Sequence, residues 1–220
     1  MSELLNEVFF TFDASMFNIL NNLAKTCGGF FTPVFKVISL IGEKGLIFFL
    51  SSLILMLFSK TRKFGICMFG AVACGALITN VILKDLIARP RPFEVSAEYF
   101  DFYKFIGAPE EDGFSFPSGH MTATMSAMTV VFIFCNKKWS WVSFIFAILM
   151  GVSRVYLISH YATDVLAGII VGALSGIVAL LITNLIFKIL YKYEKNKLSK
   201  FILNFDIVKL FKSKNKGDNA

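Results

Sequence analysis

Charged residues are scarce in this chain of 220 amino acids. Asp, Glu, Lys and Arg together make up 17% of it, whereas about a quarter of a typical soluble domain is charged. Hydrophobic residues make up 56%, and the mean hydropathy is +0.68. The composition excludes an ordinary soluble domain and favours a protein that lies in a membrane, with a length that allows one domain.

Cysteine is also sparse, and its arrangement gives no sign of a metal. The spacing of the four cysteines matches no metal-binding motif. Three of them lie within or at the end of apolar stretches, where a free cysteine behaves as a small hydrophobic residue. We interpret all four as packing residues, and we expect no cofactor. They are Cys27, Cys67, Cys74 and Cys135.

Five stretches without any charged residue predict the transmembrane helices. A transmembrane helix needs about 20 residues, so the second and fifth stretches are long enough alone and the other three need flanking residues. Lys44 and Lys60 can extend the first, because their long side chains reach the interface. We predict an all-α fold, a polytopic membrane helix bundle with about five transmembrane helices in a core at 44–190. The five stretches are 45–59, 64–83, 121–136, 139–153 and 165–187.

The first 43 residues are apolar but interrupted by charge, glycine and proline. Asp13 and Lys25 stand within the first part, and Pro33 and Lys36 within the second. We predict that 1–43 forms helices that lie in or near the membrane interface. The competing interpretation is a sixth transmembrane helix near 30–41, which Pro33 and Lys36 weaken.

The formal net charge of +7 could indicate nucleic-acid binding, but the positions of the basic residues argue against it. They cluster at 60–63, at 137–138 and after residue 187, and five transmembrane helices place all three regions on one side. The positive-inside rule makes that side cytoplasmic. The connections 84–118 and 154–164 then face outward from the cell membrane. Residues 191–220 form a basic cytoplasmic tail, either amphipathic on an anionic membrane surface or free in solvent.

Histidine occurs only twice, and both copies lie at the outward ends of predicted transmembrane helices. These are His120 and His160. Other ionisable residues share these ends, and any single one is most simply an interfacial anchor. The set is not explained in this way, because anchors occur on both faces and need no histidine. The further members are Lys84, Arg89, Arg91, Arg154 and Asp164.

The stretch LKDLIARPRPF brings several cations together after the second transmembrane helix. Lys84 ends that helix, and Pro90 and Pro92 prevent it from continuing. Arg89 and Arg91 therefore lie in a stiff, extended exit. A guanidinium fork and a lysine ammonium are both suited to phosphate oxygens.

The stretch FPSGH predicts an anion site at the start of the third transmembrane helix. Ser118 is a natural N-cap, and Gly119 lets the backbone approach a ligand closely. The helix that follows presents free N–H groups and the positive end of its dipole. His120 lies in the first turn, beside any anion bound there, and a cap alone would need only the serine.

The stretch SRVYLISHYATD adds a histidine and a carboxylate. Ser153 and Arg154 end the fourth transmembrane helix, and His160 and Asp164, four residues apart, share one face if the fifth helix begins at His160. The carboxylate can then accept a hydrogen bond from one imidazole nitrogen, which leaves the other as a base or nucleophile. A pair of this kind taken alone is as readily a helix-surface contact.

Together the three stretches place two imidazoles, one carboxylate and at least three cations around a helix N-terminus. This set favours phosphoryl transfer through a covalent phosphohistidine, with cations and N–H groups stabilising the phosphoryl oxygens. One histidine attacks and the other protonates the leaving oxygen. No carboxylate cluster indicates a metal, so we predict a metal-independent site.

Three ordered patterns, K-x6-RP, PSGH and SR-x5-H-x3-D, resemble the type 2 phosphatidic acid phosphatase (PAP2) superfamily, which includes bacterial membrane lipid phosphatases. The resemblance covers the motifs from Lys84 to Asp164 and, by layout, the surrounding helices. It implies that His160 is the nucleophile, oriented by Asp164, and that His120 is the general acid. Arg89 lies outside the pattern, and its role stays open. The phosphate-binding residues that the resemblance implies are Lys84, Arg91, Ser118, Gly119 and Arg154.

Many relatives have six transmembrane helices where we count five. The compact length favours undecaprenyl diphosphate as the substrate, whereas the intact motifs fit that lipid or a broader phosphatidic acid and phosphatidylglycerophosphate phosphatase. Five apolar stretches argue against the soluble vanadium haloperoxidases of the superfamily. A non-catalytic membrane lipid binder or transporter is the other alternative, and it would need neither the two histidines nor the carboxylate. The sequence does not set the oligomeric state.

Overall fold

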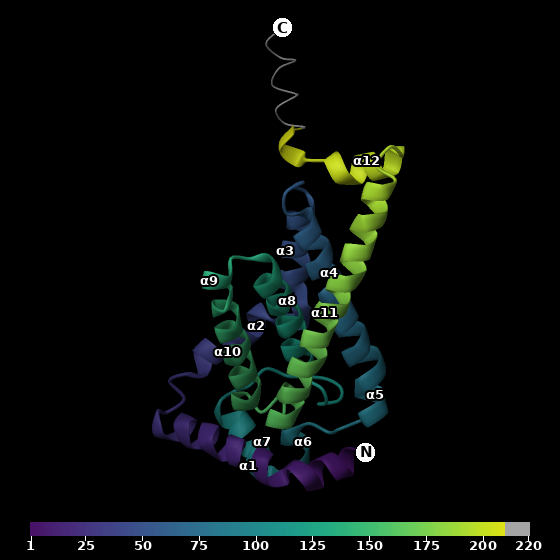
Figure 1. The fold of residues 1–220 in the computed structure, drawn as a ribbon. Coiled ribbons are helices and arrows are strands. Elements are labelled where there is room, and N and C mark those ends of the chain that lie inside the picture. Colours follow the sequence, from purple (N-terminus) through teal and green to yellow (C-terminus); the bar gives the residue numbers. More distant parts are fainter. Residues whose placement is uncertain (210–220) are drawn as a thin grey trace.

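The computed structural model describes residues 1–209, and within that range it contains helices and no strands. Figure 1 shows the long helices side by side in a bundle, with α1 (Ser2–Thr26) across one end and α12 (Lys197–Asn204) across the other. The predicted all-α helix bundle is confirmed. Its main helices are α2 (Thr32–Ile41), α3 (Leu46–Met56), α4 (Arg62–Leu77), α8 (Gly119–Phe134), α10 (Val142–Tyr156) and α11 (Ala162–Lys192).

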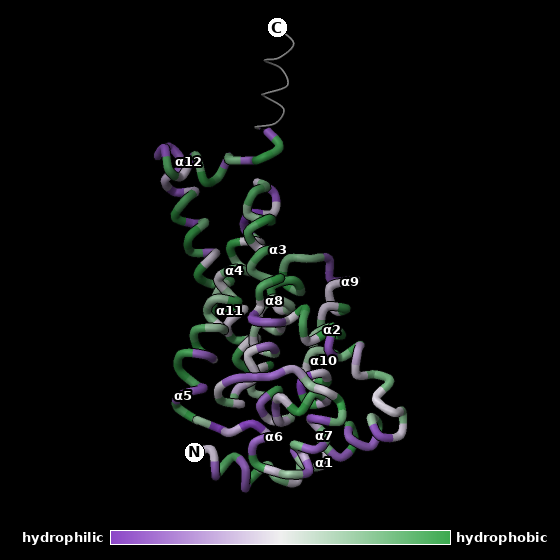
Figure 2. The backbone as a smooth tube through the Cα atoms, turned by 180° about the vertical axis from the view of Figure 1, so that it is seen from behind, coloured by the Kyte–Doolittle hydropathy of each residue, from purple (hydrophilic) through white to green (hydrophobic). Residues whose placement is uncertain are grey.

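Four helical segments of the described range are long and apolar enough to cross a membrane, and α8 is a shorter apolar helix. All five stretches predicted as transmembrane helices are thus mainly helical, and the protein is a multi-pass membrane protein. Figure 2 shows hydrophobic residues along the bundle and hydrophilic ones concentrated at the end where α1 and the short helices α6 (Pro92–Val95) and α7 (Ala97–Phe105) lie. The four long segments are Thr32–Met56, Arg62–Val95, Lys137–Tyr156 and Ala162–Lys192.

The first of these segments begins earlier than the sequence indicates. The predicted stretch starts at residue 45, whereas the helical segment starts at Thr32 and includes α2, the short turn η1 (Glu43–Gly45) and α3. Pro33 lies in the first turn of α2, where proline is tolerated, so it starts this helix and does not break it. The alternative of a helix near 30–41 was therefore partly right. That region is helical, but it is the first half of the first segment and not a separate sixth transmembrane helix. It packs against α10.

Glycines bring α8 and α11 into close contact. A Cβ atom on Gly172 would lie 2.6 Å from the backbone oxygen of Thr122, and one on Gly168 would lie 2.9 Å from the backbone oxygen of Ser118. Small residues four apart let membrane helices approach in this way. The Ser118 amide also donates to the Asp164 backbone oxygen at 3.1 Å, so the starts of the two helices are joined.

The chain between α4 and α8 carries the first group of predicted cations to the same end. The π-helical turn η2 (Ile78–Leu83) precedes α5 (Lys84–Ile87), which ends at Ala88 with a positive φ of 50°. Residues 88–91 are not helical, as the prolines predict. Three short helices complete the described chain: α6 (Pro92–Val95), α7 (Ala97–Phe105) and, beyond α8, α9 (Lys137–Ser140).

The opposite end is closed by Arg62, which the sequence analysis treated only as part of a basic connection. Its guanidinium donates to the backbone oxygens of Met56 at 3.0 Å and Ile202 at 2.6 Å, and Asp206 accepts from the amide of Ser59 at 3.0 Å. These bonds fix α12 to the α3–α4 turn. The last part of the predicted tail, 210–220, lies outside the described residues.

Among the cysteines, Cys67 is buried as predicted, but Cys135 is exposed and is not a packing residue.

Candidate active site

A cavity of about 740 Å³ opens at the end of the bundle that carries α1. Its lining comes from α2, the turn η1, the chain from α4 to Arg91, the 109–112 connection, the start of α8 and the connection before α11. Five of the eight predicted site residues line it, namely Lys84, Arg91, Gly119, His120 and His160. Four other polar lining residues are not among the predicted site residues, namely Lys36, Ser39, Lys44 and Asn80.

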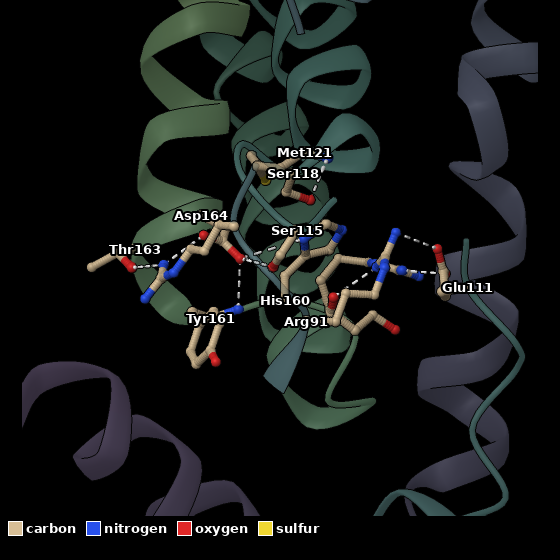
Figure 3. Close-up of polar contacts among 12 residues, drawn as sticks. Arg91, Glu111, Ser115, Ser118, Met121, His160, Tyr161, Thr163 and Asp164 are labelled. Carbon is tan, nitrogen blue, oxygen red and sulfur yellow. Dashed lines mark hydrogen bonds and ion pairs between the residues drawn. The ribbon is translucent and has the colours of Figure 1, made fainter. Parts of the chain in front are cut away.

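His160 lies in the connection between α10 and α11 and is almost fully buried. Its Nδ1 is 3.6 Å from Oδ2 of Asp164, which stands in the first turn of α11 (Figure 3). At this separation the two groups are not hydrogen-bonded, and within residues 1–209 this Nδ1 has no hydrogen-bond partner. Burial and the charges of Arg154 and Arg91 hold the pKa of His160 well below its ordinary value. The imidazole is therefore neutral at neutral pH, which is the form able to attack an electrophile.

Asp164 is completely buried and is held from three sides. One oxygen accepts from Nη1 of Arg89 at 2.6 Å, and the other accepts from the amide of Tyr161 at 2.9 Å and from the hydroxyl of Ser115 (Figure 3). A buried carboxylate needs such partners to offset its desolvation. Sequence reasoning missed Ser115, although it stands two residues before the proline of the FPSGH stretch.

The start of α8 has the predicted geometry. Ser118 is the N-cap, and its hydroxyl accepts from the amide of Met121 at 3.4 Å (Figure 3). Gly119 packs closely against Asn80. A Cβ atom on Gly119 would lie 3.3 Å from the side-chain oxygen of Asn80, which is a tight contact. His120 follows in the first turn and lines the cavity. The Ser118 hydroxyl itself is buried behind this surface.

Arg91 is fixed by backbone oxygens at the site. Its guanidinium donates to Gly113 at 2.9 Å and to Asp112 and Ser159 at 2.8 Å each. These three carbonyls belong to the two connections that sequence analysis places on the same side. The rigid Arg91 therefore links the connection before α8 to the one before α11.

Arg154 is fully buried and contacts the cavity through Glu111. It donates to the hydroxyl of Ser39 and to the carboxylate of Glu111, which also lies 3.5 Å from Nη2 of Arg91 (Figure 3). Burial favours the neutral acid, but the charge of Arg154, its hydrogen bond to Glu111 and the charge of Arg91 outweigh it, so the pKa of Glu111 lies below its ordinary value. A carboxylate thus occupies the space between two of the predicted phosphate-binding cations. Nothing in the sequence distinguished Glu111 from its acidic neighbours.

Arg89, which fits no motif, is one of the most buried residues of the chain, at 1% exposure. It contacts Asp164 directly, and it also pairs with Asp13 of α1. Asp13 was noted only as a charge that interrupts an apolar segment. The one available signal was an acid within the apolar stretch 8–17 of this helix, because such a charge needs a partner if it is buried.

Nothing in residues 1–209 resembles a metal-binding cluster, because no group of three or more His, Cys, Asp or Glu side chains is close enough to hold an ion. The absence of a cofactor stays a prediction.

The fold and the site define a polytopic membrane protein with a histidine, carboxylate and arginine cluster in a cavity at one end of the bundle. The sequence model of the PAP2 superfamily matches residues 46–188, and the chain therefore belongs to the PAP2 superfamily. The prediction of a phosphatase, a hydrolase that acts on phosphate groups of lipids, is confirmed at the level of this family.

The curated relatives include enzymes with several lipid substrates. Undecaprenyl-diphosphatase of Sulfolobus acidocaldarius is 30% identical over 178 residues, which are 72% of this chain and 83% of that protein. Undecaprenyl-diphosphatase BcrC of Bacillus subtilis is 30% identical over 49% of this chain and 52% of its own length. Lipid A 4'-phosphatase of Porphyromonas gingivalis is 30% identical over 56% of this chain and 54% of its own length. The chain thus spans about half the length of the last two.

Among solved structures, the crystal structure of Aquifex aeolicus LpxE has the same fold. The two superpose with a TM-score of 0.61 at 23% sequence identity, over 76% of this chain and 93% of that one. At this identity the likeness establishes the fold.

Proposed function

We propose that this protein removes a phosphate group from a membrane lipid through a phosphohistidine on His160, with undecaprenyl diphosphate as the favoured substrate. The observation that carries the proposal is the shared cavity. His120 of α8 and His160 of the connection before α11 both line it together with Lys84 and Arg91. A volume of about 740 Å³ also exceeds what a phosphate group needs and lies in the range of ligand pockets.

In the first step the free nitrogen Nε2 of His160 attacks phosphorus. A nitrogen–phosphorus bond forms while the bond from phosphorus to the lipid-side oxygen breaks, and His120 gives its proton to that oxygen. Asp164 faces Nδ1 of His160 at 3.6 Å, so its negative charge stabilises the positive charge that develops on the ring.

In the second step water attacks the phosphohistidine. An oxygen–phosphorus bond forms, the nitrogen–phosphorus bond breaks, and His120 takes up the proton that the water loses. Inorganic phosphate leaves, and both histidines return to their starting states. With a lipid diphosphate the other product is the lipid monophosphate.

The phosphoryl oxygens are bound by Lys84, Arg91 and Arg154 and by the N-terminus of α8 at Ser118 and Gly119. Free amides at a helix start suit an anion, and guanidinium groups bind its oxygens in pairs. Because Glu111 lies between Arg91 and Arg154, the phosphate displaces this carboxylate when it binds both arginines. Nε of Arg154 is buried and, among the described residues, has no hydrogen-bond partner, so one donor is free for the ligand.

The substrate preference rests on a relative that aligns over 178 residues, which are 72% of this chain and 83% of that protein. That protein is named undecaprenyl-diphosphatase. Relatives over shorter segments are named lipid A phosphatases and phosphatidylglycerophosphatase B, so phosphate monoesters of other lipids are the alternative. Membership of a hydrolase family makes a non-catalytic lipid binder the weaker hypothesis.

The site faces outward in the proposed orientation in the plasma membrane. Figure 1 shows α1 at one end of the bundle and the turn between α3 and α4, which holds the basic residues 60–63, at the other end with α12. The residues that line the cavity come from the α1 end. The positive-inside rule assigns the basic end to the cytoplasm.

A substrate panel tests this function. Purified protein in detergent is incubated with undecaprenyl diphosphate, phosphatidylglycerophosphate, lipid A phosphate and phosphatidic acid, with and without EDTA, and released phosphate is measured. We expect the highest kcat/KM on undecaprenyl diphosphate, unaffected by EDTA. A higher value on a monoester overturns the substrate assignment, and activity that EDTA abolishes and a divalent ion restores overturns metal independence. No phosphate release from any of the four would contradict the function itself.

A further inference from the structure

Arg89 lies behind the proposed catalytic pair and bonds to four side chains. Its Nη1 donates to Asp164 at 2.6 Å and to the hydroxyl of Thr163 at 2.7 Å. Its Nη2 donates to Asp13 at 2.8 Å, and its Nε to Asn6 at 2.8 Å. The guanidinium carbon also lies over the ring of Tyr161, 3.7 Å from its centre. Arginine is the side chain that can hold several acceptors in one fixed plane.

Asp13 extends this contact to helix α1. One of its oxygens accepts from the amide of Thr163 at 2.9 Å, and the other accepts from the Thr163 hydroxyl at 2.8 Å as well as from Arg89. Asp13 is 5% exposed although it stands on a helix with an otherwise largely exposed surface. The helix that lies across the end of the bundle therefore supplies one buried side chain to the surroundings of Asp164.

The charges in this cluster do not cancel. One guanidinium cation is shared by two buried carboxylates, which leaves one net negative charge. If Arg89 faced Asp164 alone, the pair would be neutral. Asp13 takes part of the arginine charge, so Asp164 keeps an excess of negative charge toward His160.

The two oxygens of Asp164 have separate partners. Oδ1 accepts from Arg89, whereas Oδ2 accepts from Ser115 and Tyr161 and is the oxygen that lies 3.6 Å from Nδ1 of His160. Anchoring Oδ1 stops the carboxylate from rotating. The oxygen that faces the imidazole is thereby kept in one orientation.

We propose that Arg89 and Asp13 are positioning residues for the proposed His160–Asp164 pair, and that helix α1 is for this reason part of the active site. The inference rests on the proposed function. Arg89 fixes the carboxylate of Asp164, and Asp13 preserves the negative charge that stabilises the phosphorylated ring of His160. Both act on the chemical step and not on substrate binding, because neither residue lines the cavity.

The test compares five variants of the full-length protein with the wild type on the best substrate of the panel. They are Arg89→Gln, Arg89→Lys, Asp13→Asn, Asp164→Asn and the double variant Arg89→Gln/Asp13→Asn. Two matched controls accompany them: Arg62→Gln removes a buried arginine at the other end of the bundle, and Glu7→Gln removes an exposed acid from the same helix α1. Measurements are kcat, KM and the melting temperature in detergent.

We expect kcat of Arg89→Gln to fall about 100-fold, as misplacement of a reacting group by about an ångström does. Asp13→Asn loses about tenfold, which corresponds to the usual coupling between charged neighbours. KM stays near the wild-type value in both, because the lost interaction belongs to the transition state. Arg89→Lys recovers part of kcat, since it keeps the charge without the fork. The loss in the double variant is smaller than the product of the single losses.

Arg62→Gln lowers the melting temperature without changing kcat, and Glu7→Gln changes neither. If Arg89→Gln and Asp13→Asn fall in melting temperature like Arg62→Gln but keep kcat, their role is structural and the inference is overturned. If Arg89→Gln does not fold, Arg89→Lys and Asp13→Asn decide in the same way. Asp164→Asn distinguishes a failure of the proposed function from a failure of this inference. Full kcat in Asp164→Asn contradicts the proposed function. A low kcat in Asp164→Asn together with wild-type kcat in the Arg89 and Asp13 variants contradicts only the positioning role of Arg89 and Asp13.

Discussion

The Glu111 carboxylate lies against the buried guanidinium of Arg154 and 3.5 Å from that of Arg91. One acid of the connection before α8 is therefore shared by two cations that are proposed to bind phosphate, which leaves one net positive charge. The low pKa of Glu111 keeps this carboxylate charged at neutral pH. A phosphate that binds both arginines competes with it.

Replacing Glu111 by Gln removes that competition. We expect Glu111→Gln to bind phosphate and vanadate several-fold more tightly, because two buried cations lose their internal counter-ion and attract an external one more strongly. The measurement is the inhibition constant of each anion against lipid phosphate hydrolysis.

Glu98→Gln is the matched control, since Glu98 is an exposed acid on α7 and its loss changes the net charge equally. Weaker anion binding in Glu111→Gln than in Glu98→Gln would show that Glu111 holds the arginines in place and does not compete with the ligand.

The α8–α11 contact makes a prediction about stability. A methyl group on Gly172 would lie 2.6 Å from the backbone oxygen of Thr122 and 2.7 Å from Cβ of Met125, and neither can move without shifting α8. Gly172→Ala should therefore destabilise the protein by about 1–3 kcal/mol, the usual cost of overpacking. Gly70→Ala is the control, because its methyl group would find its nearest neighbour at an ordinary 3.7 Å. Thermal unfolding in detergent should show a lower midpoint for Gly172→Ala only, and equal midpoints would contradict the close packing.

Much of the fold was predictable because the membrane restricts the choice of structures. Uncharged stretches can only be helices or barrel strands there, and their lengths fit helices. The start of the first helical segment was not predictable from its composition. The presence of a proline and a lysine weakens the prediction of a transmembrane helix when only composition is considered. In the structure Pro33 stands at a helix start, where proline is tolerated, and Lys36 lines the cavity, where a charge is tolerated.

The site was predictable where local chemistry sets the residue type. Ser118 caps a helix and the prolines force an extended exit, so these could be inferred from neighbours in the chain. Asp13, Arg89 and Glu111 could not, because their partners are distant in the sequence. Asp13 meets Thr163 and Arg89 only once α1 lies across the end of the bundle.

The neutral state of His160 predicts a pH dependence. Its lowered pKa means that protonation, which blocks attack, sets in only well below the ordinary value of 6.5. In His120→Ala, where the other histidine no longer titrates, phosphoenzyme formation from undecaprenyl diphosphate should keep its rate between about pH 8 and 6. Rapid-quench measurements across this range give the rate. A loss of half the rate near the ordinary pKa of histidine would contradict the neutral, buried imidazole.

The proposed orientation predicts which positions are accessible from outside the cell. Lys104 on α7 lies at the cavity end and Lys197 on α12 at the other, and both are exposed. In a variant without the natural cysteines, Lys104→Cys should react with a membrane-impermeant thiol reagent in intact cells and Lys197→Cys only after lysis. The reverse pattern would place the site on the cytoplasmic side.

The two histidines should differ in what their loss removes. General acid catalysis is typically worth about 10²–10⁴-fold and less for a good leaving group. His120→Ala should therefore lose less activity on undecaprenyl diphosphate than on phosphatidic acid. The leaving group of the first is a phosphate monoester, whereas that of the second is an alcohol. His160→Ala should be inactive on both, and Asp164→Asn should lie in between. Equal losses on both substrates in His120→Ala would show that it is not the general acid.

The phosphohistidine itself is the central claim, and acid-labile, alkali-stable label on the protein tests it most directly. Wild type and the three variants are mixed with undecaprenyl diphosphate labelled at the terminal phosphate and quenched in alkali within the first turnover. We predict labelled protein for wild type, His120→Ala and Asp164→Asn, and none for His160→Ala. Label on His160→Ala at the wild-type level would contradict the assignment of His160 as the nucleophile.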